Sequence, residues 1–219
     1  LITNVSHDIK TPLTSIINYV DLLEKECRDN DVTAEYIDVL ERQSARLKKL
    51  IEDLIEASKA SSGSLPVHAE RLEAGVFLVQ TVGEFEERTK ANRLELLIRK
   101  PEDAVYIEAD GRHLWRVIDN LMNNVCKYAQ PDTRVYIDME TAEDGVEIIF
   151  RNTSKYPLNI SGEELTERFV RGDSSRNTEG SGLGLSIARS LTELMGGHFS
   201  LYVDGDLFKV ILSFPIAGL

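Results

Sequence analysis

The chain has 219 residues, which is enough for one or two domains with a hydrophobic core. Its net charge of −12 argues against a general nucleic-acid-binding protein, because such proteins carry a basic face. No apolar run approaches the ~18 residues of a membrane span, and Cys27 and Cys126 lack any paired spacing, so both are interpreted as free thiols of a reducing compartment.

Two helical patterns open the chain. Apolar residues alternate at three- and four-residue spacing over positions 2–23 and again over 37–55, which is typical of a helix-bundle seam. The polar break at Arg28–Asp31 is short, so we expect an antiparallel helical hairpin. A second copy would complete a four-helix bundle, so the sequence predicts a homodimer. Because the helical pattern of apolar residues is already present at Leu1, we expect the chain to be a fragment that lacks an upstream part.

A linker is expected from Ser58 to Pro66, where small and polar residues precede a glycine and a proline. It would divide a helical domain, residues 1–62, from a second domain, residues 63–219. In the second domain we expect strands near 67–72, 94–99, 105–109, 134–141, 146–152, 198–203 and 208–214, and helices near 74–90, 111–129 and 184–195. Runs of two adjacent strands predict an α+β sandwich with helices on one face. The polar stretch between Asn152 and Gly180 has the length of a lid.

His7 lies on the first expected helix, and the apolar seam turns it toward solvent. A neutral, accessible imidazole is a good nucleophile toward phosphorus. Asp8 can accept the Nδ1 proton, and Thr11, one turn further on, could position a water for the reverse hydrolysis. Pro12 removes a backbone N–H and should bend the helix. A lone exposed histidine is usually a plain surface residue, and it is the whole string that favours a functional one.

That string, SHDIKTPL at residues 6–13, resembles the H-box of two-component sensor histidine kinases. Three further strings resemble motifs of that family, in the family order: DNLMNNVCKYA at 119–129 the N-box, ERFVR at 167–171 the F-box, and GSGLGLS at 180–186 the second glycine box. Together they are far more specific than any one of them. The resemblance implies a Bergerat-type ATP-binding domain after the hairpin, with ATP and Mg²⁺ as cofactors.

Asn120 and Asn124 are four residues apart on an expected helix and share a face. Mg²⁺ prefers oxygen ligands and keeps several waters. The resemblance implies that Asn124 is the Mg²⁺ ligand and that Asn120 lies beside it at the phosphates. Lys127, one turn on, could reach the phosphates. Tyr128 could lie along the adenine or ribose, although core packing explains it equally well.

The glycine box comes directly before an expected helix, which is the arrangement that phosphate binding needs. Gly180, Gly182 and Gly184, with Leu183 between them, let the backbone approach an anion. The N–H groups at the start of the following helix then point at the phosphates. Upstream, Arg171 and Arg176 could neutralise charge on the γ-phosphoryl group, although a solvated loop charge explains Arg176 nearly as well.

One position departs from the family pattern. The family carries an Asp-x-Gly-x-Gly box after the strand that here ends near Phe150, and its Asp accepts a hydrogen bond from the adenine amino group. This chain has Asn152, Thr153 and Ser154 there, without glycines. The amide oxygen of Asn152 can still accept, so we expect Asn152 to bind adenine without the stronger charge-assisted bond.

The resemblance implies an active kinase. The γ-phosphoryl group would pass from ATP to Nε2 of His7, and then to an Asp of a response regulator receiver domain docked against the hairpin. Asp8 and Thr11 also suggest phosphatase activity toward that regulator. By resemblance, upstream segments would anchor a membrane sensor whose core, this chain, lies in the cytoplasm.

Two alternatives stay open. A degenerate kinase that acts as a dimeric nucleotide-binding scaffold is supported only by the altered box at Asn152. The intact His7, Asn124 and glycine box argue against it. A related ATPase of the chaperone or topoisomerase kind would lack the histidine-bearing hairpin, and ATP hydrolysis without phosphohistidine would identify it.

Overall fold

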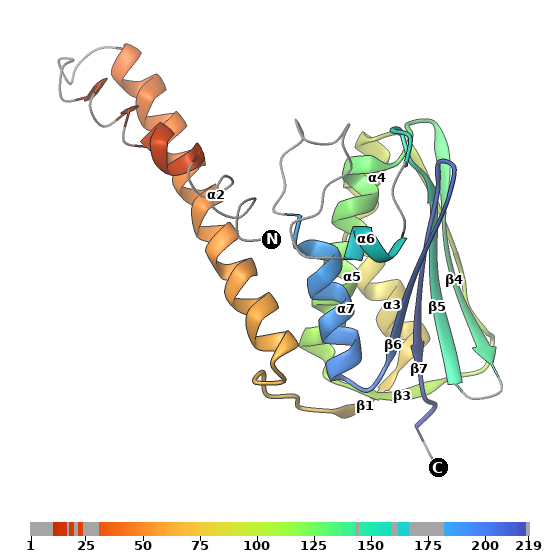
Figure 1. Ribbon diagram of the computed structural model, residues 1–219. Helices are drawn as coiled ribbons and strands as arrows, with labels where there is room; N and C mark the ends of the chain where they lie inside the picture. Colours follow the sequence, from red (N-terminus) through yellow and green to blue (C-terminus); the bar gives the residue numbers. More distant parts are fainter. Residues whose placement is uncertain are drawn as a thin grey trace. The chain divides into compact units, whose positions relative to one another are not determined.

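The fold is that of a computed structural model, which describes residues 11–16, 18–19, 22–23, 31–142, 145–158, 162–166 and 182–217 (Figure 1). The chain forms two compact units, Leu1–Glu56 and Ala57–Leu219. In the described parts, no helix is both long enough and apolar enough to cross a membrane.

The first unit is helical. Residues 11–16, 18–19 and 22–23 are helical, and α2 spans Asp31–Ser61. The rings of Tyr19 and Tyr36 lie 5.5 Å apart, so the two helical segments are in contact at these residues. The predicted turn at Arg28–Asp31 lies almost entirely outside the described residues. The predicted linker at Ser58–Pro66 is wrong at its start, because α2 continues through Ser61. The helix ends at Ser61, two residues before Gly63, which adopts a left-handed φ of 66° that suits glycine.

The second unit is built on a five-stranded sheet in the order β2-β4-β5-β7-β6. The strands are β2 (Leu94–Arg99), β4 (Thr133–Ala142), β5 (Gly145–Thr153), β6 (His198–Asp204) and β7 (Leu207–Phe214). β2 pairs with β4 in parallel, and all other neighbours are antiparallel. A separate antiparallel pair joins β1 (Glu70–Glu73) to β3 (Tyr106–Ala109).

Helices cover one face of this sheet, as the sequence predicts for an α+β sandwich (Figure 1). They are α3 (Ala74–Gly83), α4 (Glu86–Ala91), α5 (Gly111–Tyr128), α6 (Gly162–Thr166) and α7 (Gly184–Leu194). The core between the layers contains fully buried side chains from the helices and from the inward face of the strands: Leu78, Leu114, Ile118, Leu121, Met122, Ile137, Ile148, Phe150, Ile187 and Phe214.

Two details of the second unit differ from the sequence prediction. The helix expected over 74–90 is two helices, because the chain turns at Glu84–Phe85 and buries the Phe85 ring, which is 4% exposed. The stretch expected to be a polar lid contains α6. This short helix lies close to β6, since a side chain on Gly162 would collide with the carbonyl of Leu201.

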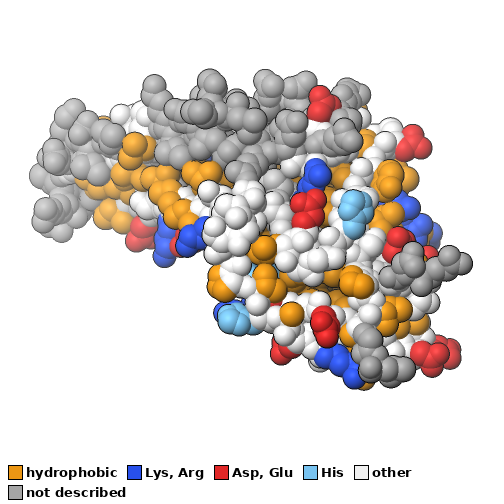
Figure 2. All heavy atoms as spheres, turned by 60° about the horizontal axis from the view of Figure 1, so that its bottom comes forward, with side chains coloured by type: hydrophobic (Ala, Val, Ile, Leu, Met, Phe, Trp, Pro, Cys, Tyr) orange, Lys and Arg blue, Asp and Glu red, His pale blue; other side chains and the backbone are white. Residues whose placement is uncertain are grey.

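The end of the molecule that carries β1 and β3 presents apolar side chains between charged ones (Figure 2). Exposed apolar residues of α3, β3 and the segment after β7 include Val76, Val79, Tyr106 and Ile216. That last segment is held to β3, because Ala217 donates its N–H to the carbonyl of Tyr106 over 2.7 Å.

Candidate nucleotide site

The N-box string forms most of α5, an amphipathic helix with one buried face: Leu114, Val117, Ile118, Leu121, Met122, Val125 and Cys126. Burial raises the pKa of the Cys126 thiol, so this cysteine stays protonated and inert. Asn120 and Asn124 flank the buried stripe and are half-buried, one helical turn apart. The helix therefore holds both amides at the border between core and solvent.

The glycine box lies directly against this helix. The side chain of Asn120 approaches Gly184 so closely that a Cβ there would fall 3.3 Å from Oδ1 of Asn120. Gly182 has a left-handed φ of 69°, a conformation that few residues other than glycine adopt. The fold thus brings together two motifs that are far apart in the sequence, and glycine is needed at their contact.

Both asparagines leave donors unused. Among the residues that the structure describes, buried Nδ2 atoms of Asn120 and Asn124 have no hydrogen-bond partner. Their neighbour Asn123 differs, because its amide donates to the carbonyl and side chain of Asp119 and accepts from Arg88. Unsatisfied buried donors are rare in proteins, so the two free amides indicate a ligand with acceptor oxygens.

Helix α7 starts at this same place. Leu183 is fully buried at the N-cap position, and no side chain caps the N–H groups of the first turn in the described part of the chain. The hydroxyl of Ser186 instead turns back and donates to the carbonyl of Leu183 over 2.9 Å. Uncapped N–H groups at a helix start form a ready anion site, which suits a phosphate.

Asn152 is joined to the end of α5 through the backbone. Gln130 donates its N–H to the carbonyl of Thr153 over 2.8 Å, and Lys155 donates to the carbonyl of Tyr128 over 2.9 Å. Asn152 itself is only 5% exposed, and its Nδ2 donates to the carbonyl of Thr153 over 3.3 Å. The amide nitrogen is therefore occupied, and Oδ1 is the atom left to accept a hydrogen bond.

Lys127 and Tyr128, at the end of α5, are both half-buried. The Lys127 ammonium lies 5.8 Å from the centre of the Tyr128 ring, so the cation covers the aromatic side chain. The two side chains thus form one amphipathic pair at the end of the helix that carries Asn124.

Several predicted site residues lie outside the described residues: His7, Asp8, Arg171, Arg176 and Gly180. Thr11 is described, and it is helical and exposed. Within the described ranges, no group of three His, Cys, Asp or Glu residues could hold a metal ion. The amide oxygen of Asn124 is of the ligand type that Mg²⁺ accepts beside phosphate and water oxygens.

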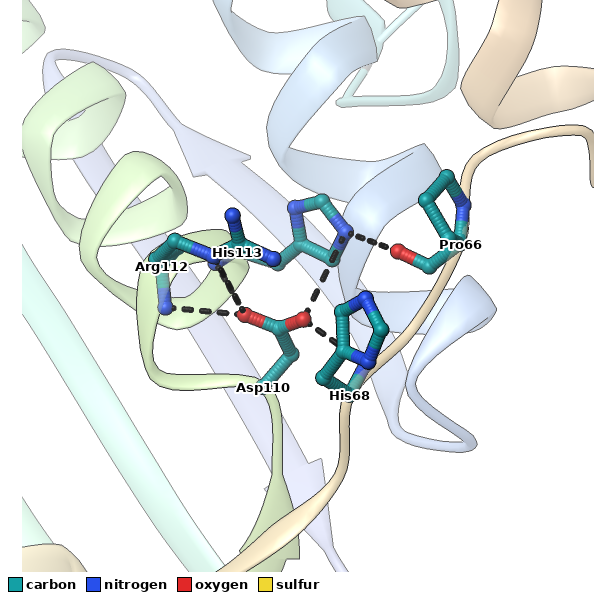
Figure 3. A network of polar contacts seen from close by, with 5 residues as sticks. All are labelled: Pro66, His68, Asp110, Arg112 and His113. Atoms are coloured by element: carbon teal, nitrogen blue, oxygen red, sulfur yellow. Dashed lines mark hydrogen bonds and ion pairs between the residues drawn. The ribbon is translucent and has the colours of Figure 1, made fainter.

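Sequence reasoning missed one polar network, at the start of α5 (Figure 3). Asp110 is the N-cap residue, and its carboxylate accepts from the backbone N–H groups of Arg112 and His113. It also accepts from the N–H of His68, over 2.8 Å. An aspartate before an apolar helix is a recognisable N-cap signal, but the bond to His68 depends on the tertiary fold.

Two family models match the chain. The model for the "His Kinase A (phospho-acceptor) domain" matches residues 1–63. The model for the "Histidine kinase-, DNA gyrase B-, and HSP90-like ATPase" matches residues 109–217. The second match contains all the described residues of the candidate nucleotide site.

Known proteins give the same result. The chain is 31% identical over 206 residues to the sensor protein VanS of Enterococcus faecium, covering 92% of this chain and 52% of that protein. It is 28% identical over 202 residues to the sensor histidine kinase WalK of Bacillus subtilis, covering 90% of this chain and 33% of that protein. The chain thus spans about half or less of the length of these curated relatives.

Solved structures share the fold. The histidine kinase AdeS of Acinetobacter baumannii superposes with a TM-score of 0.76 at 18% identity, over 97% of this chain and 98% of that one. Full-length ShkA in complex with AMPPNP gives a TM-score of 0.73 at 20% identity, over 99% of this chain and 46% of that one. Histidine kinase ThkA in complex with the response regulator protein TrrA gives a TM-score of 0.73 at 20% identity, over 99% of this chain and 61% of that one. With both family models in the expected order and sensor kinases as relatives, the chain belongs to the two-component sensor histidine kinases.

Proposed function

We propose that this chain is the core of a sensor histidine kinase that transfers the γ-phosphoryl group of ATP to His7. Residues 1–62 form the dimerisation and phosphotransfer domain, and residues 63–219 form the catalytic domain. The observation that carries the proposal is the contact between Asn120 and Gly184, where one of the two unsatisfied amides on α5 lies against the first residue of α7.

At the nucleotide site, Asn124 holds Mg²⁺ through its amide oxygen, and its free Nδ2 and that of Asn120 donate to phosphate oxygens. The backbone from Gly180 to Gly184, including Gly182 and Leu183, lies along the phosphates, and the first N–H groups of α7 bind them. Lys127 adds positive charge, Tyr128 lies along the adenine or ribose, and Oδ1 of Asn152 accepts from the adenine amino group. Bound MgATP supplies the phosphoryl group and the divalent cation.

At the acceptor end, Asp8 accepts the Nδ1 proton of His7 and leaves Nε2 free to attack. Arg171 and Arg176 neutralise negative charge during transfer. The exposed Thr11, one turn after His7, orients a water in the reverse, phosphatase reaction. These roles follow from the sequence motif and from the family to which the chain belongs.

The active species is a homodimer through the hairpin. Apolar side chains of the seam stay exposed in the single chain: Leu13, Leu22, Ile37, Ile51 and Ile55. A second copy would bury them and complete a four-helix bundle. The receiver domain of a response regulator then takes the phosphoryl group from His7, as the ThkA–TrrA complex suggests for a structural neighbour. Segments upstream anchor the protein to a membrane, with this core in the cytoplasm.

Incubation of the purified chain with γ-labelled ATP and Mg²⁺ tests the proposal. We expect acid-labile, alkali-stable label on the wild type and none on His7→Gln, because a phosphorylated imidazole is labile to acid and stable to alkali, unlike a phosphorylated hydroxyl or carboxylate. Label that persists in His7→Gln, or ATP hydrolysis without any labelled protein, would contradict the proposal. Nucleotide binding without label would instead favour the degenerate scaffold.

A further inference from the structure

The segment between α2 and β1, here called the linker, lies within the second unit and is bonded to the start of α5 (Figure 3). His68 donates its backbone N–H to Oδ2 of Asp110 over 2.8 Å. The ring nitrogen Nε2 of His113 lies 3.0 Å from the carbonyl oxygen of Pro66. Because a carbonyl can only accept, Nε2 carries the proton and donates it. Two adjacent points of the linker are therefore held by one helix start.

The carboxylate of Asp110 accepts hydrogen bonds from both the start of α5 and the linker. Oδ1 of Asp110 caps α5 by accepting from the N–H groups of Arg112 and His113, over 3.0 and 3.3 Å. Its Oδ2 accepts from the linker and lies 3.9 Å from Nε2 of His113. The side chains are 2% exposed for Asp110 and 15% exposed for His113. The bonds to the carboxylate are therefore partly shielded from water, whereas the bond between His113 and Pro66 lies at the surface. If the linker left α5, Oδ2 of Asp110 would lose its bond from His68 and the His113 ring would lose its bond to Pro66, while Oδ1 could still cap the helix.

Helix α5 is continuous from Gly111 to Tyr128 and carries Asn120 and Asn124. A helix transmits displacement of its first turn along its axis, because its backbone bonds fix each turn to the next. We propose that Asp110 and His113 are positioning residues that fix the linker to the nucleotide-binding helix, and thereby set the rate of phosphoryl transfer to His7 without contacting the nucleotide. The inference rests on the proposed kinase function.

The physical reason is entropic. Transfer between two units needs the γ-phosphoryl group and the imidazole in one geometry, and each free torsion in the linker reduces the fraction of molecules in that geometry. A bond that immobilises the linker at Pro66 and His68 removes such torsions. Its loss should lower the rate of transfer and leave ATP affinity unchanged.

The test compares three variants of the full chain. His113→Ala removes the bond to Pro66. His113→Gln places an amide N–H near the position of Nε2 and should keep it. Arg112→Ala is the matched control on the same turn: it removes a long ion pair between an exposed guanidinium and Oδ1 of Asp110, at 3.8 Å, and it keeps the backbone N–H and both contacts to the linker. For each we would measure the single-turnover rate of autophosphorylation, ATP affinity by displacement of a fluorescent analogue, and hydrogen exchange at the His68 amide.

We expect His113→Ala to phosphorylate about fivefold more slowly, the factor that one net hydrogen bond is worth. Its ATP affinity should be unchanged and exchange at His68 faster. His113→Gln and Arg112→Ala should match the wild type in all three. An unchanged rate in His113→Ala would overturn the inference and leave the kinase function standing. Equal losses of rate and affinity would overturn it too, by showing a role in folding the site. Absence of label on the wild type would overturn both proposals.

Discussion

The amide of Asn120 and the backbone of Gly184 lie in direct contact, although they belong to different helices and different sequence motifs. The contact joins the middle of α5 to the first residue of α7. Each partner has a reason to be there: the asparagine has a free donor, and the glycine leaves room for it. Substitutions at this contact should therefore change the affinity for nucleotide more than they change the stability of the fold.

Gly184→Ala should weaken ATP binding about tenfold, or about 1.4 kcal/mol. The added Cβ would lie 3.3 Å from Oδ1 of Asn120, so that side chain must shift by a few tenths of an ångström toward the phosphate position. Melting temperature should change little, because alanine favours the helix. Calorimetric titration with MgATP measures the effect. Gly83→Ala, where no atom lies within 4 Å of the new Cβ, is the matched control and should bind normally.

Asn124→Ala should reduce autophosphorylation by more than about a hundredfold, because a metal ligand contributes several kcal/mol to the transition state. Asn123→Ala is the adjacent control. Its amide is already engaged with Asp119 and Arg88, so it should cost stability and leave Mg²⁺ dependence as in the wild type. Initial rates across a Mg²⁺ titration distinguish the two. Equal losses in both variants would argue against a metal role for Asn124.

Asn152→Ala should weaken ATP binding about tenfold by removing a buried acceptor, while Asn152→Asp should bind at least as tightly as the wild type. The carboxylate forms a charge-assisted bond with the adenine amino group. Binding of GTP, which presents a carbonyl at that position, should not improve in Asn152→Asp. Affinities of ATP and GTP for the three proteins provide the measurement, and an Asn152→Ala variant with unchanged affinity would exclude this side chain from adenine recognition.

Removal of Arg151 should destabilise the second unit by about 3 kcal/mol, because it leaves the buried carboxylate of Asp138 largely unpaired. That side chain is 4% exposed, and its other cation, Arg99, lies 3.9 Å away. Urea unfolding of Arg151→Met measures the loss. The double variant with Asp138→Leu should recover most of it. Glu95→Ala is the control. It breaks the ion pair with Arg134, in which both side chains are 62% exposed, and it should lower the unfolding free energy by less than about 0.5 kcal/mol.

The stability that the Asp110 carboxylate contributes to the fold should be lost in acid. Burial would raise its pKa, but hydrogen bonds from the backbone N–H groups of His68 and His113 outweigh burial and hold the pKa below its ordinary value of 3.8. A lowered pKa stabilises the fold fully above the unfolded-state value, and this contribution is lost as the pH falls through the folded value.

The matching variant is Asp110→Asn, which still caps the helix and does not titrate. The difference in unfolding free energy between wild type and variant should be constant from pH 7 to about pH 5 and should shrink below pH 4. Urea unfolding at four pH values between 7 and 3 gives this difference. A constant difference over the whole range would show that the carboxylate is not ionised preferentially in the folded state.

Much of the fold is predictable from the sequence, because strands and helices differ in the period of their apolar residues. All seven strands and α5 and α7 lie close to the predicted positions. The turn between α3 and α4 is not predictable, since residues 84–90 (EFEERTK) are also compatible with a continuous helix and only the burial of Phe85 distinguishes the turn. The five residues of α6 are too few to show a period.

The candidate site is predictable as motifs but not as contacts. Asn120, Asn124 and the glycines carry local signals, whereas their meeting depends on how α5 and α7 pack. The chain just after Asn152 is bonded to the end of α5 and the residues that follow it, through Lys155 to Tyr128 and Gln130 to Thr153, and no local pattern encodes these bonds. The bond between Asp110 and His68 of the linker is likewise not predictable, because neither residue carries a local sequence signal for it.

The sheet order β5-β7-β6 has a consequence for synthesis on the ribosome. β7 is the last of the five strands to be made, yet it lies between β5 and β6, and within the described residues β6 pairs with no other strand. Until residues 207–214 leave the exit tunnel, the nascent chain exposes the unpaired edge of β5 and has no place for β6. The helical hairpin can form early from local contacts, so between the synthesis of β5 and that of β7 the emerging chain would hold a folded hairpin followed by an incomplete, aggregation-prone sheet.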